Sequence, residues 1–209
     1  MRKSKYLAFD TETGGLNPLK NPILTAFFGI IGEDFGLIDE LNLYIRPEAP
    51  FDTVEPDALA INKIDLSEHL ESPRTVSLTE AKGQLLNFLK KHKGAKMADR
   101  LRPMGYNIDF DLGMVWAQLL PPTDWNANVH YAKMDPKTIV DFLKESGWLP
   151  PEIGKLESLA KHFNISTLGA HECRSDTLMM VESYKRLIDM LKDRKNDSLS
   201  FDILSMLEK

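Results

Sequence analysis

The stretch from Tyr6 to Leu16 constrains this chain more than any other. An apolar run rich in strand-forming residues predicts a buried strand, and Gly14-Gly15 ends it. Side chains alternate in direction along a strand, so Asp10 and Glu12 project from one face, roughly 6 to 7 Å apart. One hard cation could bridge that spacing, but such pairs also begin solvated turns. A metal site therefore requires more carboxylates, and a proton acceptor, from elsewhere in the chain.

Composition indicates one globular domain, since 209 residues with 43% hydrophobic content suffice for a sizeable core. The single cysteine, Cys173, excludes an internal disulfide and favours a reducing, cytoplasmic setting. No stretch is long enough to cross a bilayer, so we expect no membrane partner. The net charge of −5 argues against coating duplex nucleic acid, but not against gripping a chain end where bound metal ions supply positive charge.

The order of predicted elements indicates a mixed α/β sheet. Three successive strands predict an antiparallel meander, and later strands alternate with helices, which favours parallel pairing with helices on both faces. The expected strands begin at Tyr6 and span 23–32, 35–45, part of 96–107, and 129–134. The expected helices span 56–61, 78–93, 109–120, 135–146, 156–163 and 172–191. We expect one domain over residues 1–192, and over 193–209 a tail or short helix that docks on the core or engages a partner.

Two further carboxylates stand where apolar residues are expected. The apolar stripe of the last helix, which includes Met180 and Leu187, leads back by one turn to Asp176, and that face offers no Lys or Arg. A carboxylate there is costly to bury unless it is paired or binds metal. Asp111 also lies on an apolar helix face, although acidic residues in a first turn often only complement the helix dipole. We expect Asn107 or Asp109 to cap that helix.

His171 lies five residues before Asp176, at the entrance of the long helix. A histidine in a glycine-flanked loop can serve as a mobile general base, and it can equally be a surface or capping histidine. Cys173 has neither a tetrahedral ligand set nor an oxyanion hole around it in the sequence, so we interpret it as a small buried residue.

Three segments together resemble the motifs of the DEDDh (DnaQ-like) 3′-to-5′ exonucleases, the group typified by the proofreading epsilon subunit of bacterial DNA polymerase III. The segment from Phe9 to Leu16 resembles the first motif and Gly105 to Asp111 the second, while Gly169 to Asp176 is similar to the third. Residues 56–64 also resemble the segment between the first two motifs. The resemblance runs from about residue 6 to residue 191; it departs at Tyr106, where relatives often carry His, and at Asn62-Lys63, where His-Gly is common.

This resemblance implies a ribonuclease H-like fold and an enzyme that releases nucleoside 5′-monophosphates from the 3′ end of single-stranded DNA. Proofreading beside a polymerase is one role that it implies. It implies that two Mg²⁺ or Mn²⁺ ions bind a set of four carboxylates, namely Asp10, Glu12, Asp111 and Asp176. His171 would accept the proton of the attacking water. The implied substrate contacts are Thr11, Thr13, Leu16, Asn62 and Asn107, with Leu16 wedged against a base.

Aromatic residues are candidates for base stacking as well. Of the three tryptophans, we expect Trp116 and Trp148 to pack in the core, and Trp125, in the loop 121–128, to be more open.

Three alternatives stay open at this point. The same metals cleave RNA, so an exoribonuclease is the runner-up. A catalytically silent nucleic-acid or polymerase-binding module would use the fold as a scaffold, but loss of a carboxylate would be its signature and none is lost. A haloacid-dehalogenase-type phosphatase would need Asp at the position of Glu12, and the early meander fits that fold poorly. The sequence does not decide the oligomeric state.

Overall fold

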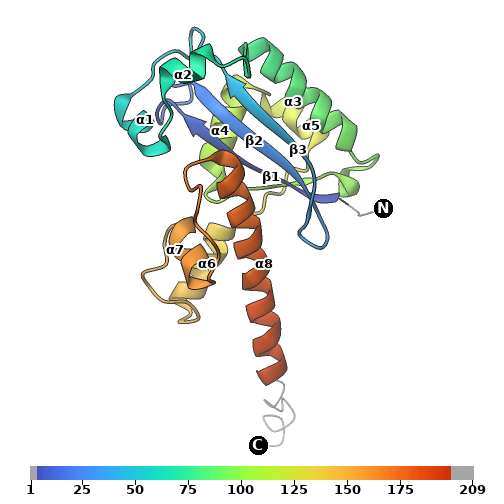
Figure 1. Ribbon diagram of the computed structural model, residues 1–209. Coiled ribbons are helices and arrows are strands. Elements are labelled where there is room, and N and C mark those ends of the chain that lie inside the picture. The colour runs from blue at the N-terminus through green and yellow to red at the C-terminus, as the bar shows by residue number, and fades with distance from the viewer. Residues whose placement is uncertain (1–3, 199–209) are drawn as a thin grey trace, which may run out of the picture.

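The strand that begins at Ser4 is an inner strand of a five-stranded mixed sheet, in a computed structural model that describes residues 4–198 (Figure 1). The expected meander forms from β1 (Ser4–Thr13), β2 (Ile23–Gly32) and β3 (Leu37–Ile45), paired antiparallel. β5 (Arg102–Met104) pairs parallel to β1, and β4 (Thr75–Val76) pairs parallel to β3. The strand order is β4-β3-β2-β1-β5, which confirms the predicted mixed α/β sheet.

Helices cover both faces of this sheet. The helices are α1 (Pro56–Asn62), α2 (Leu66–Glu71), α3 (Leu78–His92), α4 (Ile108–Gln118), α5 (Pro122–Asn128), α6 (Pro136–Glu145), α7 (Leu156–His162) and α8 (Cys173–Ser198), with a 3₁₀ turn at Met97–Asp99. One face packs against α3, α4 and α5 through a core that includes Leu7, Phe9 and Phe28. The other packs against α8 through Tyr6, Ala8 and Met180 (Figure 1).

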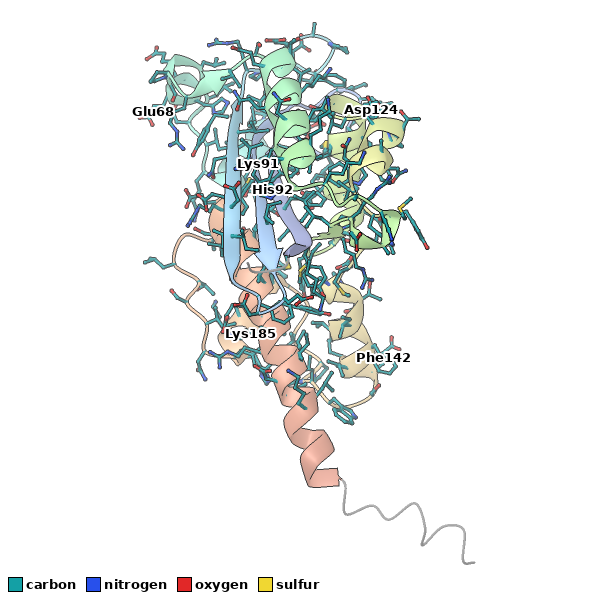
Figure 2. The ribbon with its side chains drawn as sticks, turned by 90° about the vertical axis from the view of Figure 1, so that its right-hand side faces the viewer. Glu68, Lys91, His92, Asp124, Phe142 and Lys185 are labelled. Atoms are coloured by element: carbon teal, nitrogen blue, oxygen red, sulfur yellow. The ribbon has the colours of Figure 1, made fainter. Side chains whose placement is uncertain are left out.

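The helix signals of the sequence are largely confirmed. Ser77 accepts a hydrogen bond from the Glu80 N–H and completes a capping box at the start of α3. Asp135 caps α6 by accepting a hydrogen bond from the Lys137 N–H. In the last turn of α3, Lys91 and His92 contact Asp39 of β3, so basic side chains at this helix end pair with the sheet (Figure 2).

The predicted strand over 129–134 is wrong. Met134 donates its N–H to the Pro103 carbonyl, and Met104 and Met134 form a single parallel bridge. Pro103 has no N–H to donate back on that side, and the next bond, from the His130 N–H to the Leu101 carbonyl at 2.9 Å, is out of register with a regular ladder. β4, which the sequence did not indicate, is the fifth strand instead.

Two tryptophan predictions are also wrong. Residues 122–128 form α5 rather than a loop, and Trp125 is 1% exposed, with its ring edge-on to Phe9 at 5.5 Å between centroids. Trp148, expected in the core, is 40% exposed. Trp116 is partly buried against the core, as expected.

The predicted boundary at residue 192 falls within α8, which continues to Ser198. Residues 199–209, the rest of the expected tail, lie outside the described residues, so its docking stays a prediction. Within residues 4–198 no helix is both long and apolar enough to span a membrane.

Candidate active site

Two carboxylates and a thiol meet beside the C-terminal end of β1. Single ligand atoms of Asp10, Glu12 and Cys173 all lie within 4.8 Å of one another. Asp10 and Glu12 project from one face because alternate residues of a strand share a face, as the sequence predicted. Cys173 joins them because it opens α8, which packs on that face of the sheet.

Asp111 reaches this end of the sheet from the first turn of α4 and is 4% exposed. Its Oδ1 accepts hydrogen bonds from the Thr11 N–H at 3.0 Å and from the Thr11 hydroxyl at 2.6 Å. Thr11 stands between Asp10 and Glu12, so one strand both carries two carboxylates and fixes a third. The predicted side-chain cap of α4 does not form: Asn107 occupies the cap position without such a bond, and Asp109 is exposed and pairs with Lys133.

Asp176 comes from the first turn of α8, as the apolar stripe predicted. Its Oδ2 accepts a hydrogen bond from the His171 backbone N–H at 3.1 Å. Its Oδ1 is buried and has no hydrogen-bond partner among the described residues. A buried carboxylate oxygen without a partner is costly, and a cation would relieve that cost.

The pKa values of all four carboxylates are raised, and burial is the first cause in each. The neighbouring charges of Asp111, Glu12 and Asp176 raise the pKa of Asp10 further. Burial, followed by the charges of Asp176 and Asp111, raises the pKa of Glu12 from 4.5 to about 8. Burial raises the pKa of Asp111 to about 7 although its Thr11 hydrogen bonds oppose the rise, and the pKa of Asp176 is raised as well. The group therefore holds protons near neutral pH unless a cation compensates its charge.

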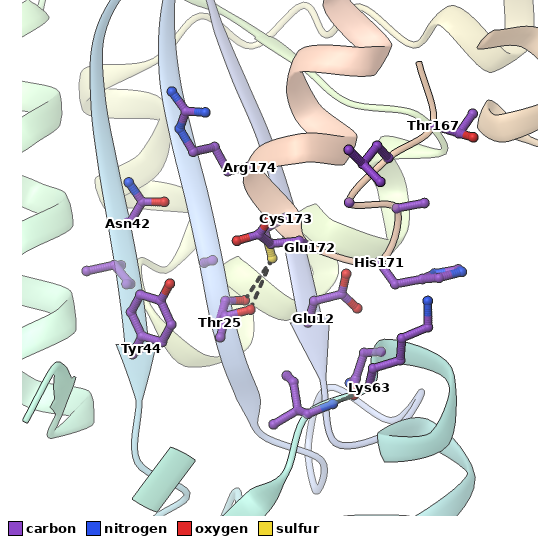
Figure 3. Close-up of a pocket in the computed structure, with 17 residues that line it drawn as sticks. Glu12, Thr25, Asn42, Tyr44, Lys63, Thr167, His171, Glu172, Cys173 and Arg174 are labelled. Carbon is purple, nitrogen blue, oxygen red and sulfur yellow. Dashed lines mark hydrogen bonds between the residues drawn. The ribbon is translucent and has the colours of Figure 1, made fainter. Parts of the chain in front are cut away.

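Cys173 is buried, as expected, but the sequence did not indicate that it borders the carboxylates. Its Sγ lies 3.2 Å from the Thr25 hydroxyl on β2, as the dashed lines in Figure 3 show. Burial, followed by the charges of Asp10 and Glu12, raises the pKa of the Cys173 thiol well above its usual value. The residue is therefore a neutral thiol here.

His171 reaches the site through its backbone, while its ring lies elsewhere. The ring Nε2 lies 3.3 Å from Glu157 Oε1 of α7, and Figure 3 shows the ring extending away from Glu12. The loop before α8 takes left-handed backbone angles at Gly169 (φ 86°) and His171 (φ 73°). The structure thus brings the four predicted carboxylates together but leaves the predicted base turned toward Glu157.

Two hollows meet at Glu12 and Asn62, which line both. The larger, of about 640 Å³, lies between Thr25 of β2, Tyr44 of β3 and the loop that carries His171 (Figure 3). The smaller, of about 380 Å³, has an apolar rim formed by Leu16 (79% exposed) and Ile61 (65% exposed), with Phe110 in its wall.

Four of the five expected substrate contacts line the smaller hollow: Thr11, Thr13, Leu16 and Asn62. Asn107 does not line it. The Thr13 hydroxyl donates to the Gly15 carbonyl, and the Asn62 side chain donates to the Thr13 carbonyl and accepts from the Ile64 N–H. These polar side chains therefore shape the turn around the hollow, whereas Leu16 stands free at its rim.

Neither a protein-family model nor the sequence of a curated protein matches the chain. The fold is similar to solved structures of exonuclease I. The Escherichia coli enzyme in complex with a dA16 oligonucleotide gives a TM-score of 0.71 at 17% identity, covering 95% of this chain and 42% of that one. A zinc-bound form of the E. coli enzyme with single-stranded DNA gives a TM-score of 0.67 at 17% identity, covering 96% of this chain and 43% of that one. Exonuclease I from Methylocaldum szegediense gives a TM-score of 0.66 at 20% identity, covering 92% of this chain and 41% of that one.

This likeness confirms the predicted ribonuclease H-like fold. The chain spans less than half the length of these exonuclease I chains.

Proposed function

We propose that the chain is a metal-dependent 3′-to-5′ exonuclease that removes nucleoside 5′-monophosphates from single-stranded DNA. The observation that carries the proposal is the group of four carboxylates drawn from β1, α4 and α8, in which Asp176 Oδ1 is buried without a partner. The shared fold with exonuclease I, whose solved forms hold oligonucleotides and zinc, supports the same chemistry.

The group fits divalent metal ions. Its oxygen donors suit Mg²⁺ and Mn²⁺, and the raised pKa values reflect burial first and mutual repulsion second, both of which a cation would offset. Asp10, Glu12, Asp111 and Asp176 would hold two ions, which when bound supply Lewis-acid stabilisation and an activated water for phosphodiester hydrolysis. Thr11 contributes indirectly, because its two hydrogen bonds orient Asp111 toward the group.

The smaller hollow would receive the 3′-terminal nucleotide. Leu16 and Ile61 present exposed apolar surface at its rim, where an unstacked base can be held and a continuous duplex cannot. Asn62 and Thr13 would keep the rim in position through their backbone hydrogen bonds.

His171 would accept the proton of the attacking water after its ring leaves Glu157. The left-handed angles at Gly169 and at His171 itself locate the segment that would have to move. A base carried by a movable loop would couple substrate entry to assembly of the site.

A time course on a 5′-labelled single-stranded DNA and on the matched RNA tests the proposal, with Mg²⁺, Mn²⁺ or chelator. We expect a metal-dependent ladder that shortens from the 3′ end of DNA and is absent in Asp10→Ala. Faster shortening of the RNA would replace the substrate assignment by an exoribonuclease. Cleavage of neither polymer under any metal would refute the proposal and favour a binding module.

Proofreading beside a polymerase is the finer part of the proposal, and it is supported by the resemblance to the epsilon subunit. Comparing the rates on a primer with a mismatched and a matched 3′ end tests it, because a proofreader removes the frayed mismatched nucleotide faster. Equal rates on the two primers would contradict it.

A further inference from the structure

A cationic pocket lies at the opposite end of β1 from the carboxylates. A cavity of about 400 Å³ is lined by Lys5, Glu33, Ala98, Asp99, Arg100, Arg102 and His130. Glu12 follows Lys5 by seven positions along β1, a distance of roughly 23 Å at 3.3 Å per residue. The cationic pocket is therefore separate from the candidate active site.

The two arginines of this pocket are less exposed to solvent than its carboxylates. Arg100 and Arg102 are half-buried, whereas Glu33 and Asp99 are exposed. Neither arginine forms an ion pair with any side chain from residue 5 to residue 192. The two carboxylates therefore do not neutralise the guanidinium groups.

Both guanidinium groups also keep a donor unused. The Nε atoms of Arg100 and Arg102 are buried and have no hydrogen-bond partner among the described residues. Arg100 is held in place, because its Nη1 donates to the Asn126 carbonyl at 2.6 Å. Each guanidinium group also carries donors at Nη1 and Nη2, and two such groups lining one cavity, with Arg100 held in place, match the oxygens of a phosphate.

An aromatic ring stands beside these cations. Tyr131 is 73% exposed and stacks on His130, with 4.6 Å between ring centroids and planes 23° apart. His130 lines the pocket, and the Tyr131 ring stacks on this lining residue. Cations with an adjoining exposed aromatic ring are the combination that binds nucleotides through phosphate contact and base stacking.

We propose that this cationic pocket binds a nucleotide unit, with its phosphate against Arg100 and Arg102 and its base on Tyr131. The unit is either a free nucleotide or one nucleotide of a single strand, since both carry the same phosphate and base. Binding is independent of turnover at the carboxylates.

Titration of the full chain in chelator, with binding followed by fluorescence anisotropy or calorimetry, tests this site without degrading the ligand. The probes are inorganic phosphate, dAMP, dT4 and dT16, and the variants are Arg102→Gln and Tyr131→Ala. Arg186→Gln, which changes an arginine paired with Glu182 on α8, is the matched control. Circular dichroism checks that each variant folds. Tyr131 is exposed, so we expect Tyr131→Ala to fold, and it still tests the site if Arg102→Gln does not fold.

We expect both variants to weaken dAMP binding at least fivefold, and Arg102→Gln alone to weaken phosphate binding. If only dT16 responds, the nucleotide belongs to a strand that also spans other contacts. Unchanged binding of dAMP and dT16 in both variants would overturn the site, and a loss in Arg102→Gln with none in Tyr131→Ala would overturn the nucleotide assignment. Because the readout is binding in chelator, its failure and the failure of the exonuclease proposal are separate results.

Discussion

The charge conflict among the carboxylates has a measurable cost in stability that the variant Glu12→Gln isolates. Without metal, Glu12 has its pKa raised from 4.5 to about 8 by burial and by the charges of Asp176 and Asp111. A carboxyl whose pKa is higher in the folded state stabilises the protein fully below pH 4.5, and this contribution is lost as the pH rises through 8. Glutamine is nearly isosteric and never ionises, so the variant escapes this loss.

The size of the effect follows from the pKa. Each pKa unit corresponds to about 1.4 kcal/mol, so the rise from 4.5 to about 8 gives at most about 5 kcal/mol. Glu12 is only half-buried, and solvent screening reduces this to about 2 to 4 kcal/mol. In chelator, Glu12→Gln should thus exceed the wild type by less than about 1 kcal/mol near pH 5 and by the full amount near pH 9.

Urea unfolding at the two pH values, in chelator, measures the difference in the free energy of unfolding. Glu71→Gln, at an exposed position in α2, is the control and should show no such pH-dependent gain. Added Mg²⁺ should stabilise the wild type more than the variant at pH 9, because it binds the ionised carboxylates. A free-energy difference between Glu12→Gln and wild type that is the same at pH 5 and pH 9 would refute the reasoning.

Three other substitutions test separate parts of the site. Asp176→Asn should abolish nearly all turnover with the fold retained, because it removes a proposed metal ligand whose Oδ1 has no partner. Exonuclease rates and circular dichroism measure this, and full activity would contradict the metal assignment. Thr11→Val should weaken metal binding and cost about 1.5 to 3 kcal/mol of stability, since it deletes the 2.6 Å hydrogen bond from the Thr11 hydroxyl to Asp111. An unchanged affinity for Mn²⁺ in calorimetry would contradict the role of Thr11 in orienting Asp111. His171→Ala should keep Mn²⁺ affinity and lose most of the rate, with partial recovery at higher pH as hydroxide replaces the base; loss of metal instead would make His171 a ligand.

The sequence was sufficient to predict the sheet and the carboxylates because both leave periodic signals. Alternation along β1 placed Asp10 and Glu12 on one face, and the apolar stripe of α8 marked Asp176 as a carboxylate on a buried face. Asp111 was found in the same way, although the capping bond expected beside it does not form.

Other features depend on tertiary contacts that no local pattern carries. The pair Pro121-Pro122 indicates a helix end before the loop expected over 121–128. Proline is also favoured at a first helical position, and α5 begins at Pro122 and buries Trp125. The strand over 129–134 failed because it depends on pairing with residues 101–104, which lie far away in sequence. The position of the His171 ring depends on Glu157, which only the fold brings near.

The central claim is that the four carboxylates form a divalent metal site, and electron paramagnetic resonance of free Mn²⁺ tests it most directly. The matched pair is Asp111→Asn and Asp109→Asn: both change an aspartate in the first turn of α4, but only Asp111 faces the group, while Asp109 is exposed. The account predicts that wild type and Asp109→Asn each bind two Mn²⁺ ions and that Asp111→Asn loses at least one of them. Equal Mn²⁺ binding by Asp111→Asn and Asp109→Asn would contradict it.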